Sequence, residues 1–419
     1  MLTLFSIPKP FRGHIGIIQR NAIKSWTLLH PACEITLFGN EKGTTEVAAE
    51  FGVRHIPEVL CNEFGTPLVN SAFDMAQNIS RHKLVAYINT DIILMSDFME
   101  AIRQIKAGSF LMVGQRWDVE LKKRWDFTQP DWEERLRLFI SEKGTLHPST
   151  GIDYFVFPKG LFKKLPPFVI GRAGWDNWLL YRARTLGVKV IDATPVVMVV
   201  HQNHDYSHIP RGIPGTWEGP ESEYNRKLIG CSEKFFAIND AATYILTPNN
   251  LLKSPVYLAQ QGKFKEAEEK LKEILALRID KDRYEIFISL GSVYFKQGRQ
   301  KEAKKKFKKA LSLAKTDCEK ARSYYNLGSV LKQEGLMEEA KEIFERVINL
   351  SPLERKDFIG GAHFHLGCIY RSLGESEGAK REFETCLKLI PDHKMAKEYL
   401  EAFKRIDHRQ NAEENFKES

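Results

Sequence analysis

A carboxylate follows a short apolar segment in the first part of the chain. The apolar run at residues 84–88 ends in Asn89-Thr90-Asp91 and continues into a second apolar stretch. If the run is a buried strand, Asp91 projects at the carboxyl edge of a sheet, where its oxygens suit Mg²⁺ or Mn²⁺. Such an ion can hold a diphosphate while that group departs from a reacting carbon. An ordinary Asn/Asp turn at a strand end is the alternative interpretation.

A second carboxylate stands at the expected start of a helix. The segment Gly171-Arg172-Ala173-Gly174-Trp175 carries loop glycines and leads to Asp176. A loop-borne carboxylate beside a cleft can accept a proton from an attacking hydroxyl, so Asp176 is a candidate general base. A plain helix N-cap is the alternative.

A group of histidines follows the apolar run at residues 196–200. His201, His204 and His208 lie there together with Asp205. A neutral imidazole is a common metal ligand, so one of these histidines could complete the metal shell of the expected site. Zinc held by the histidines alone fits less well, because a closed zinc site normally has four ligands and no cysteine is near. A non-ligand role for most of them also remains open.

Apolar runs that alternate with helical patterns predict the elements that position these side chains. We expect buried strands at residues 2–6, 34–38, 84–89, 110–114, 188–192 and 196–200, and helices at 18–29, 44–51 and 68–79. This order favours right-handed crossovers and a mostly parallel sheet, with ligands at the carboxyl ends of its strands. A further strand at 151–157 makes Asp153 a candidate for a substrate pocket, with a turn at the strand start as the alternative.

The second half of the chain is repetitive. Three windows share a Leu-Gly pair, a later glycine, an alanine and a phenylalanine; they begin at Leu290, Leu327 and Leu366, and a weaker copy begins at Leu258. The Leu-Gly pair and the alanine let two helices approach closely, and the central glycine ends the first helix in a tight turn. The pattern resembles the tetratricopeptide repeat (TPR) over about residues 248–405. This resemblance implies an all-α solenoid that docks a protein partner or the acceptor substrate of an enzyme domain.

Composition restricts the class of protein. The chain has 419 residues, of which 43% are hydrophobic and 28% charged, and these values exclude a disordered or collagen-like chain. No apolar run of 18 residues occurs, and the start lacks the basic region of a secretory signal. The six cysteines form no C-x-x-C pair. We therefore expect reduced thiols and a cytoplasmic protein.

The net charge of +8 permits contact with an anionic surface. Lys301, Lys304, Lys305 and Lys308 share the face of an expected helix that lies opposite its packed face. We favour a solvated face. The alternative is a site for an acidic partner or for anionic lipid, the latter giving peripheral contact with the inner face of a membrane. No aromatic residues interleave on that face, so we expect no nucleic-acid partner.

Taken in order, the carboxylate and histidine motifs resemble those of family 2 glycosyltransferases, which have a GT-A fold. The segment from Pro67-Leu-Val-Asn70 to Asn89-Thr90-Asp91 resembles the family's nucleotide-contacting helix and D-x-D motif. Gly174-Trp175-Asp176 resembles the Glu-Asp motif, and His201 the histidine after the next strand. The likeness covers about residues 1–208.

This resemblance implies a role for each matching residue. Asp91 and His201 would bind a divalent metal, Mn²⁺ or Mg²⁺, that holds the nucleoside-diphosphate sugar donor. Asn70 and Asn89 would join Asp91 in binding that donor, and Asp176 would be the catalytic base. Further candidate site residues are His204, Asp153 and Arg172.

The chain departs from the family at two positions. The first acid of the D-x-D motif is Asn89 here, and the Glu of the Glu-Asp motif is Trp175.

We predict a GT-A-like α/β domain over residues 1–245, a TPR domain over 246–407 and a polar tail over 408–419. The expected reaction is an inverting, metal-dependent sugar transfer to a hydroxyl of a glycan, lipid or protein. The alternatives are a non-catalytic TPR adaptor with a degenerate GT-A domain, and a nucleotidyltransferase, for which the segment 8–13 is a poor glycine-rich basic loop.

Overall fold

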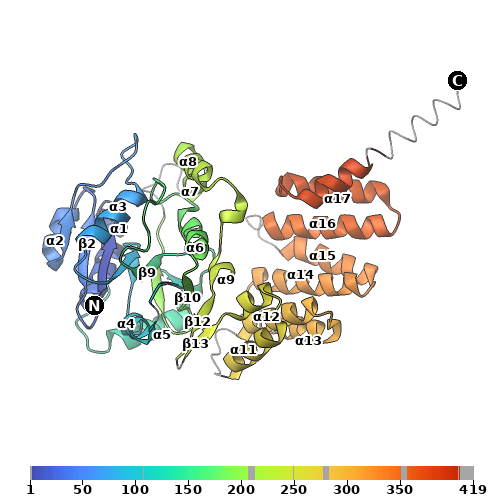
Figure 1. Cartoon of the computed structure of the whole chain (residues 1–419), viewed down its shortest axis with the longest axis horizontal. Coiled ribbons are helices and arrows are strands. Elements are labelled where there is room, and N and C mark those ends of the chain that lie inside the picture. Colours follow the sequence, from blue (N-terminus) through green and yellow to red (C-terminus); the bar gives the residue numbers. More distant parts are fainter. Residues whose placement is uncertain are drawn as a thin grey trace. The chain divides into compact units, whose positions relative to one another are not determined.

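The computed structural model describes residues 2–106, 108–205, 213–248, 250–276, 283–350, 356–403 and 405. The chain divides into two compact units, Met1–Gln261 and Gly262–Ser419 (Figure 1). The first unit contains strands and helices, and the second contains helices in its described part.

A nine-stranded sheet forms the middle layer of the described part of the first unit. Its strands, in spatial order, are β13 (Leu251–Lys253), β12 (Tyr244–Leu246), β10 (Lys189–Asp192), β6 (Phe110–Val113), β9 (Tyr154–Pro158), β4 (Leu84–Ile88), β1 (Leu2–Ser6), β2 (Glu34–Phe38) and β3 (Arg54–Ile56). β9 lies antiparallel between β4 and β6, and β13 is antiparallel to β12, whereas the other neighbours are parallel. The expected α/β unit is therefore confirmed, and its mostly parallel sheet is mixed because β9 and β13 are antiparallel to their neighbours.

Helices cover both faces of this sheet because its buried strands present apolar side chains alternately to each face. Leu4 and Ala86 face one core cluster, and Phe5 and Tyr87 face the other. The first face packs against α1 (Gly13–Thr27), α2 (Thr44–Phe51) and α4 (Ser96–Gln104). The second packs against α3 (Val69–Ile79), α6 (Trp175–Thr185), α8 (Pro220–Ile229) and α9 (Ile238–Ala241). The unit also contains α7 (Ile213–Trp217), η1 (Ser232–Lys234) and α10 (Pro255–Gln260).

A second, four-stranded sheet contains β5 (Ile92–Ile93), β11 (Val199–Gln202), β7 (Arg116–Val119) and β8 (Thr145–Leu146) in that order. α5 (Trp132–Lys143) packs on it through Trp132. The strand expected at 196–200 is displaced, because the backbone N–H groups of Val196 and Val197 both bond to the carbonyl of Ala193 and form a turn there. β11 begins only at Val199 and therefore includes His201.

Most other expected elements of the first unit agree closely with the structure, but the strand expected at 151–157 begins only at Tyr154. α1 begins at Gly13, earlier than the expected residue 18. The unit itself continues to Gln261 rather than ending at residue 245. The reason is that β12 pairs with β10 and β13 pairs with β12, so this segment extends the large sheet.

Pairs of packed helices build the second unit. Its described helices include α11 (Phe264–Ala276), α12 (Arg283–Lys296), α13 (Gln300–Leu311), α14 (Asp317–Gln333), α15 (Met337–Leu350), α16 (Lys356–Ser372) and α17 (Ser376–Leu389), and residues 394–403 are also helical. The predicted close approach is present: a Cβ atom added to Gly328 would lie 2.9 Å from the ring of Phe344, and one added to Gly367 would lie 2.7 Å from the ring of Phe383. The phenylalanine of one helix therefore occupies the space that the glycine of its partner helix leaves.

The predicted tight turns are also present. Gly298, Gly335 and Gly374 have φ angles of 73°, 80° and 83°, and Gly262 in the weaker copy has a φ of 72°. These angles lie in the left-handed region, which glycine adopts without steric cost.

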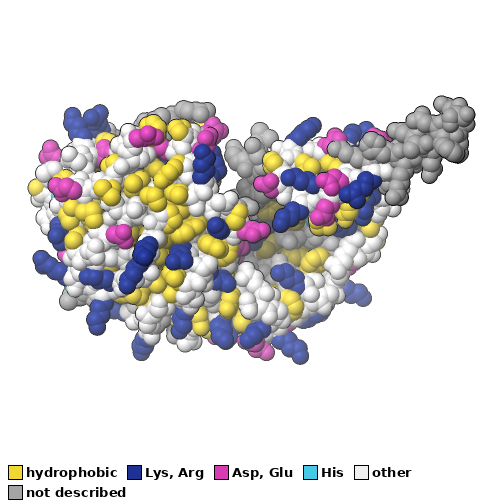
Figure 2. Space-filling model, turned by 45° about the horizontal axis from the view of Figure 1, so that its top comes forward, with side chains coloured by type: hydrophobic (Ala, Val, Ile, Leu, Met, Phe, Trp, Pro, Cys, Tyr) yellow, Lys and Arg dark blue, Asp and Glu magenta, His cyan; other side chains and the backbone are white. Residues whose placement is uncertain are grey.

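Charged groups are distributed over the surface of both units. Figure 2 shows lysine and arginine side chains interspersed with apolar and acidic ones on the face that it draws. On α13, Lys304 pairs at 3.1 Å with Glu334, the residue that follows the end of α14. Among the described helices, none combines the length and apolar character needed to cross a membrane.

Candidate functional site

The turn between β4 and β5 places Asp91 at the carboxyl end of β4. The backbone N–H of Ile92 bonds to the carbonyl of Asn89 at 3.1 Å, which closes the turn. Gln202 of β11 donates both its backbone N–H and its side-chain Nε2–H to the backbone carbonyl of Asp91. Because Ile92 pairs with His201 across β5 and β11, the same register brings His201 to the turn.

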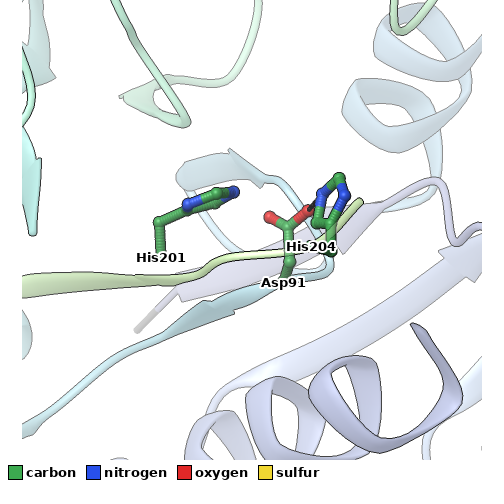
Figure 3. Close-up of side chains that lie close together, drawn as sticks. All are labelled: Asp91, His201 and His204. Atoms are coloured by element: carbon green, nitrogen blue, oxygen red, sulfur yellow. Dashed lines mark ion pairs between the residues drawn. The ribbon is translucent and has the colours of Figure 1, made fainter. Parts of the chain in front are cut away.

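Three potential metal ligands converge here: Asp91, His201 and His204. One ligand atom of each lies within 4.8 Å of the others, and their side chains are at most 5% exposed. Figure 3 shows the two imidazoles on either side of the Asp91 carboxylate. The structure thus brings the two predicted ligands together and adds the further candidate His204. His208, the third histidine of the zinc alternative, lies outside the described residues.

Lys9 supplies a positive charge to this cluster, and sequence reasoning missed it. Its Nζ donates to Asp91 Oδ2 at 2.7 Å and lies 2.9 Å from His204 Nε2. Burial alone would raise the pKa of Asp91, but the Lys9 charge and the His204 contact hold that pKa well below its usual value. Asp91 is therefore an ionised carboxylate. The sequence signal was the position of Lys9 just after the first strand, in the segment considered only as a phosphate loop.

The residues present fit a divalent metal. Asp91 Oδ1 is buried and has no hydrogen-bond partner among the described residues. A buried, unpartnered carboxylate oxygen is costly unless a ligand or ion satisfies it. One carboxylate and two imidazoles form a mixed set of oxygen and nitrogen ligands. This set suits Mn²⁺ better than Mg²⁺, because Mg²⁺ prefers oxygen ligands only.

Asp118 of β7 supports one of the histidines. Its Oδ1 lies 3.0 Å from His201 Nδ1, and its Oδ2 lies 2.6 Å from His147 Nδ1. Burial would raise the pKa of Asp118, but the hydrogen bond with His147, the contact with His201 and the charge of Arg116 keep that pKa well below its usual range. A carboxylate on one ring nitrogen orients the other nitrogen of a metal-binding histidine. Nothing in the sequence around residues 115–150 pointed to this role.

Asn89 belongs to a second polar group at the same edge of the sheet. Its Oδ1 accepts a hydrogen bond from the Tyr87 hydroxyl at 2.8 Å, and its Nδ2 donates to Asp153 Oδ1 at 2.6 Å. Arg116 Nη1 donates to the other oxygen of Asp153 at 2.7 Å. Asp153 immediately precedes β9 and faces this polar group. A contact between Asn89 and the sugar-nucleotide donor stays a prediction, since both ends of the Asn89 amide already have protein partners.

Asp176 lies in the first turn of α6, and the structure does not make it the N-cap. The N-cap is Gly174, with a φ of 96°. Loss of water contact raises the pKa of the Asp176 carboxyl to about 7, and the nearby charge of Asp153 also raises it. A carboxyl with this pKa can take up a proton near neutral pH.

Trp175, which stands where the glycosyltransferase motif considered above has a glutamate, is a core residue. Its ring lies 5.4 Å from that of Tyr87 and 5.6 Å from that of Phe155. The side chain is therefore buried under the polar edge, where a carboxylate would lose its solvation.

The remaining predicted residues lie in other contacts. Asn70 is in the first turn of α3, and its Oδ1 is buried without a hydrogen-bond partner in the described structure. Arg172 forms an ion pair with Glu221 of α8, which also accepts a hydrogen bond from Asn62. Asn70 thus keeps an acceptor for a ligand, whereas Arg172 joins the loop before α6 to α8.

Comparison with known proteins identifies the class of the second unit. Residues 284–317, 321–352 and 361–393 match family models of the tetratricopeptide repeat. These three segments are TPR repeats, as the sequence pattern predicted. The weaker copy near Leu258 lies outside the matched segments. No curated protein matches the chain.

Several solved structures are similar to part of the chain. A crystal structure of MamA is 26% identical and covers 39% of this chain and 90% of its own, with a TM-score of 0.31. A structure of MamA from Desulfovibrio magneticus RS-1 is 23% identical and covers 33% of this chain and 73% of its own, with a TM-score of 0.28. YrrB, described as a TPR protein with an unusual peptide-binding site, is 21% identical, with 42% and 78% covered and a TM-score of 0.29.

Proposed function

We propose that the repeat unit binds a protein partner and that the first unit transfers a sugar from a nucleoside diphosphate to an acceptor hydroxyl. The first part is supported by the three matched TPR segments. Stacked helical repeats present an extended concave surface that suits a protein partner.

One observation carries the transferase part: the buried cluster of Asp91, His201 and His204, in which Asp91 Oδ1 lacks a hydrogen-bond partner. The cluster lies where β4 ends, and the carboxyl ends of parallel strands are the usual ligand position in α/β sheets. A divalent ion held by these three residues would stabilise the charge that develops on a leaving diphosphate.

Asp176 is the proton acceptor in this proposal. Its pKa of about 7 leaves a useful fraction ionised at neutral pH while keeping the carboxylate basic enough to deprotonate a hydroxyl. A single base and direct displacement predict inversion at the sugar carbon. Asn70 Oδ1, buried and unpartnered, supports a contact with the nucleotide base.

A non-catalytic adaptor is the second candidate, and specific observations favour it. The similarity to known proteins rests on the TPR segments. In the first unit, Lys9 already neutralises Asp91, and Asn89 and Trp175 replace two acids of the glycosyltransferase motifs. In this case the first unit would be a scaffold, and the repeats alone would carry the function.

Metal-dependent nucleotide binding separates the two candidates. We would measure thermal unfolding of the full chain with UDP, GDP, CDP or ADP, each with Mn²⁺, with Mg²⁺ and with EDTA. Ligand at 100 times its dissociation constant stabilises a protein by about 2.7 kcal/mol, which is readily measured. The transferase predicts a metal-dependent shift for one nucleotide.

Two variants show whether such a shift comes from the proposed site. Asp91→Ala should abolish it, whereas Asp126→Ala, which removes an exposed carboxylate elsewhere in the same unit, should keep it. Release of the nucleoside diphosphate from matching sugar nucleotides then reports catalysis. If no nucleotide shifts a folded protein, the adaptor is the better assignment.

A further inference from the structure

Lys9 is held by its backbone as well as by its side chain. Its N–H donates to Gln19 Oε1 at 2.7 Å, and its carbonyl accepts from Gln19 Nε2 at 2.7 Å. Gln19 lies on α1 and is fully buried. This two-bond clamp determines where the Lys9 side chain leaves the loop that follows β1.

The Lys9 ammonium uses the same groups that a metal would need. It lies 2.7 Å from Asp91 Oδ2 and 2.9 Å from His204 Nε2. An ammonium has three donors and no acceptor, so a charged Lys9 takes the lone pair of His204 Nε2, an atom that also lies 3.3 Å from Asp91 Oδ2. One carboxylate oxygen and one imidazole lone pair thus bind an internal cation, and a metal ion would compete for both.

The charge balance of this arrangement gives a phosphate no electrostatic attraction while Lys9 stays in place. The +1 charge of Lys9 cancels the −1 charge of Asp91, so the pair presents no net charge to an anion. With a divalent ion on Asp91 and Lys9 released, three positive charges would face one negative charge. The Lys9 side chain is 27% exposed, whereas that of Asp91 is 4% exposed, so Lys9 can move toward solvent and the carboxylate cannot.

We propose that Lys9 is a displaceable internal cation of this site: it occupies the metal ligands when no ion is bound and, once displaced by the ion, binds the phosphates of the donor. The inference rests on the proposed function of the first unit. It makes Lys9 a binding residue that couples metal binding to diphosphate binding, a role not assigned to it by the motif resemblance.

The test uses Mn²⁺ alone and inorganic pyrophosphate with the full chain. Free Mn²⁺ is followed by its electron paramagnetic resonance signal, and pyrophosphate binding to the Mn²⁺-loaded protein by calorimetry. Lys9→Met should bind Mn²⁺ about tenfold more tightly than the unaltered protein, because the internal competitor is gone. The same variant should bind pyrophosphate about tenfold more weakly.

Two further variants control the experiment. Lys122→Met removes an exposed lysine that pairs with Glu120 and should change neither affinity. Lys9→Gln keeps an N–H donor for Asp91 but loses the charge, and it replaces Lys9→Met if the apolar variant does not fold. Circular dichroism and thermal unfolding verify the fold of each.

Each outcome decides the inference. If both Lys9 variants bind Mn²⁺ as tightly as the unaltered protein or more weakly, Lys9 does not compete with the metal ion. If pyrophosphate binding is unchanged in these variants, Lys9 does not bind the phosphates. Absence of Mn²⁺ binding in every variant also overturns the inference. If Mn²⁺ and pyrophosphate respond as expected but no nucleotide shifts the melting temperature, the inference about Lys9 stands and the transferase proposal fails.

Discussion

Asn89 donates its side-chain N–H to Asp153 over 2.6 Å. Its other amide atom accepts from Tyr87, and Asp153 is bound on its second oxygen by Arg116. An amide at position 89 can satisfy a hydroxyl donor and a carboxylate acceptor at once, whereas a carboxylate cannot. The presence of Asn89 where the D-x-D motif has its first acid is therefore explained by Asp153, because Asp153 requires a hydrogen-bond donor beside it.

Asn89→Asp should destabilise the first unit by about 1–3 kcal/mol at pH 8, because it places two carboxylates side by side. At pH 5 the loss should be smaller, since one proton shared by the pair relieves the repulsion. Urea unfolding at both pH values measures this. Asn78→Asp, on the exposed face of α3, is the matched control, and an equal loss at both pH values would contradict the argument.

Asp176→Asn should stabilise the protein above pH 7. The native pKa of about 7 exceeds the value of about 3.9 in an unfolded chain. The native state therefore binds this proton more tightly than the unfolded chain does. The proton contributes its full stabilisation of the native state below about pH 4, and this contribution is lost as the pH rises to about 7. The amide avoids that loss, so the variant should be more stable by about 1–2 kcal/mol at pH 8 and equal near pH 4.

The same carboxyl should determine the pH dependence of transfer. If Asp176 is the base, the rate should rise with pH and level off above about pH 7, and Asp176→Asn should lower it by about 100-fold or more while nucleotide binding persists. A rate that is flat between pH 5 and pH 8 would remove Asp176 from this role.

Asp118→Asn should weaken Mn²⁺ binding by about 10- to 100-fold, because His201 loses the carboxylate that orients its ring. His147→Gln is the matched variant: it changes the other imidazole on Asp118 and leaves the contact with His201. We expect His147→Gln to have the smaller effect in the Mn²⁺ titration. Equal losses would indicate a general disturbance of β7.

Gly328→Ala should destabilise the repeat unit by about 1–3 kcal/mol, since the added Cβ would lie 2.9 Å from the ring of Phe344. The second substitution Phe344→Leu should recover part of this loss. Ser329→Ala, one residue away on α14, should change the stability by less than about 0.5 kcal/mol. Thermal unfolding of the unaltered protein, the three single variants (Gly328→Ala, Phe344→Leu and Ser329→Ala) and the double variant measures these differences, and additive losses in the double variant would contradict the close packing.

Local patterns predicted much of the fold. β1, β2 and α2 have the expected bounds because the length and periodicity of an apolar run are properties of a short segment. The TPR turns were predictable for the same reason, since Gly298, Gly335 and Gly374 mark left-handed positions that few other residues adopt. The end of the first unit was not predictable in this way, because it depends on the pairing of β12 with the distant strand β10.

The sequence by itself determined the repeat architecture, the α/β character of the first unit and the choice of Asp91, Asp176 and His201 as chemical groups, because residue type and local spacing carry that information. Only the tertiary structure decided which charges meet. It brought Lys9 and His204 to Asp91, and Asp118 to His201, from segments far apart in the chain. Electrostatic interactions act through short distances in space, and those distances are established when the sheets assemble.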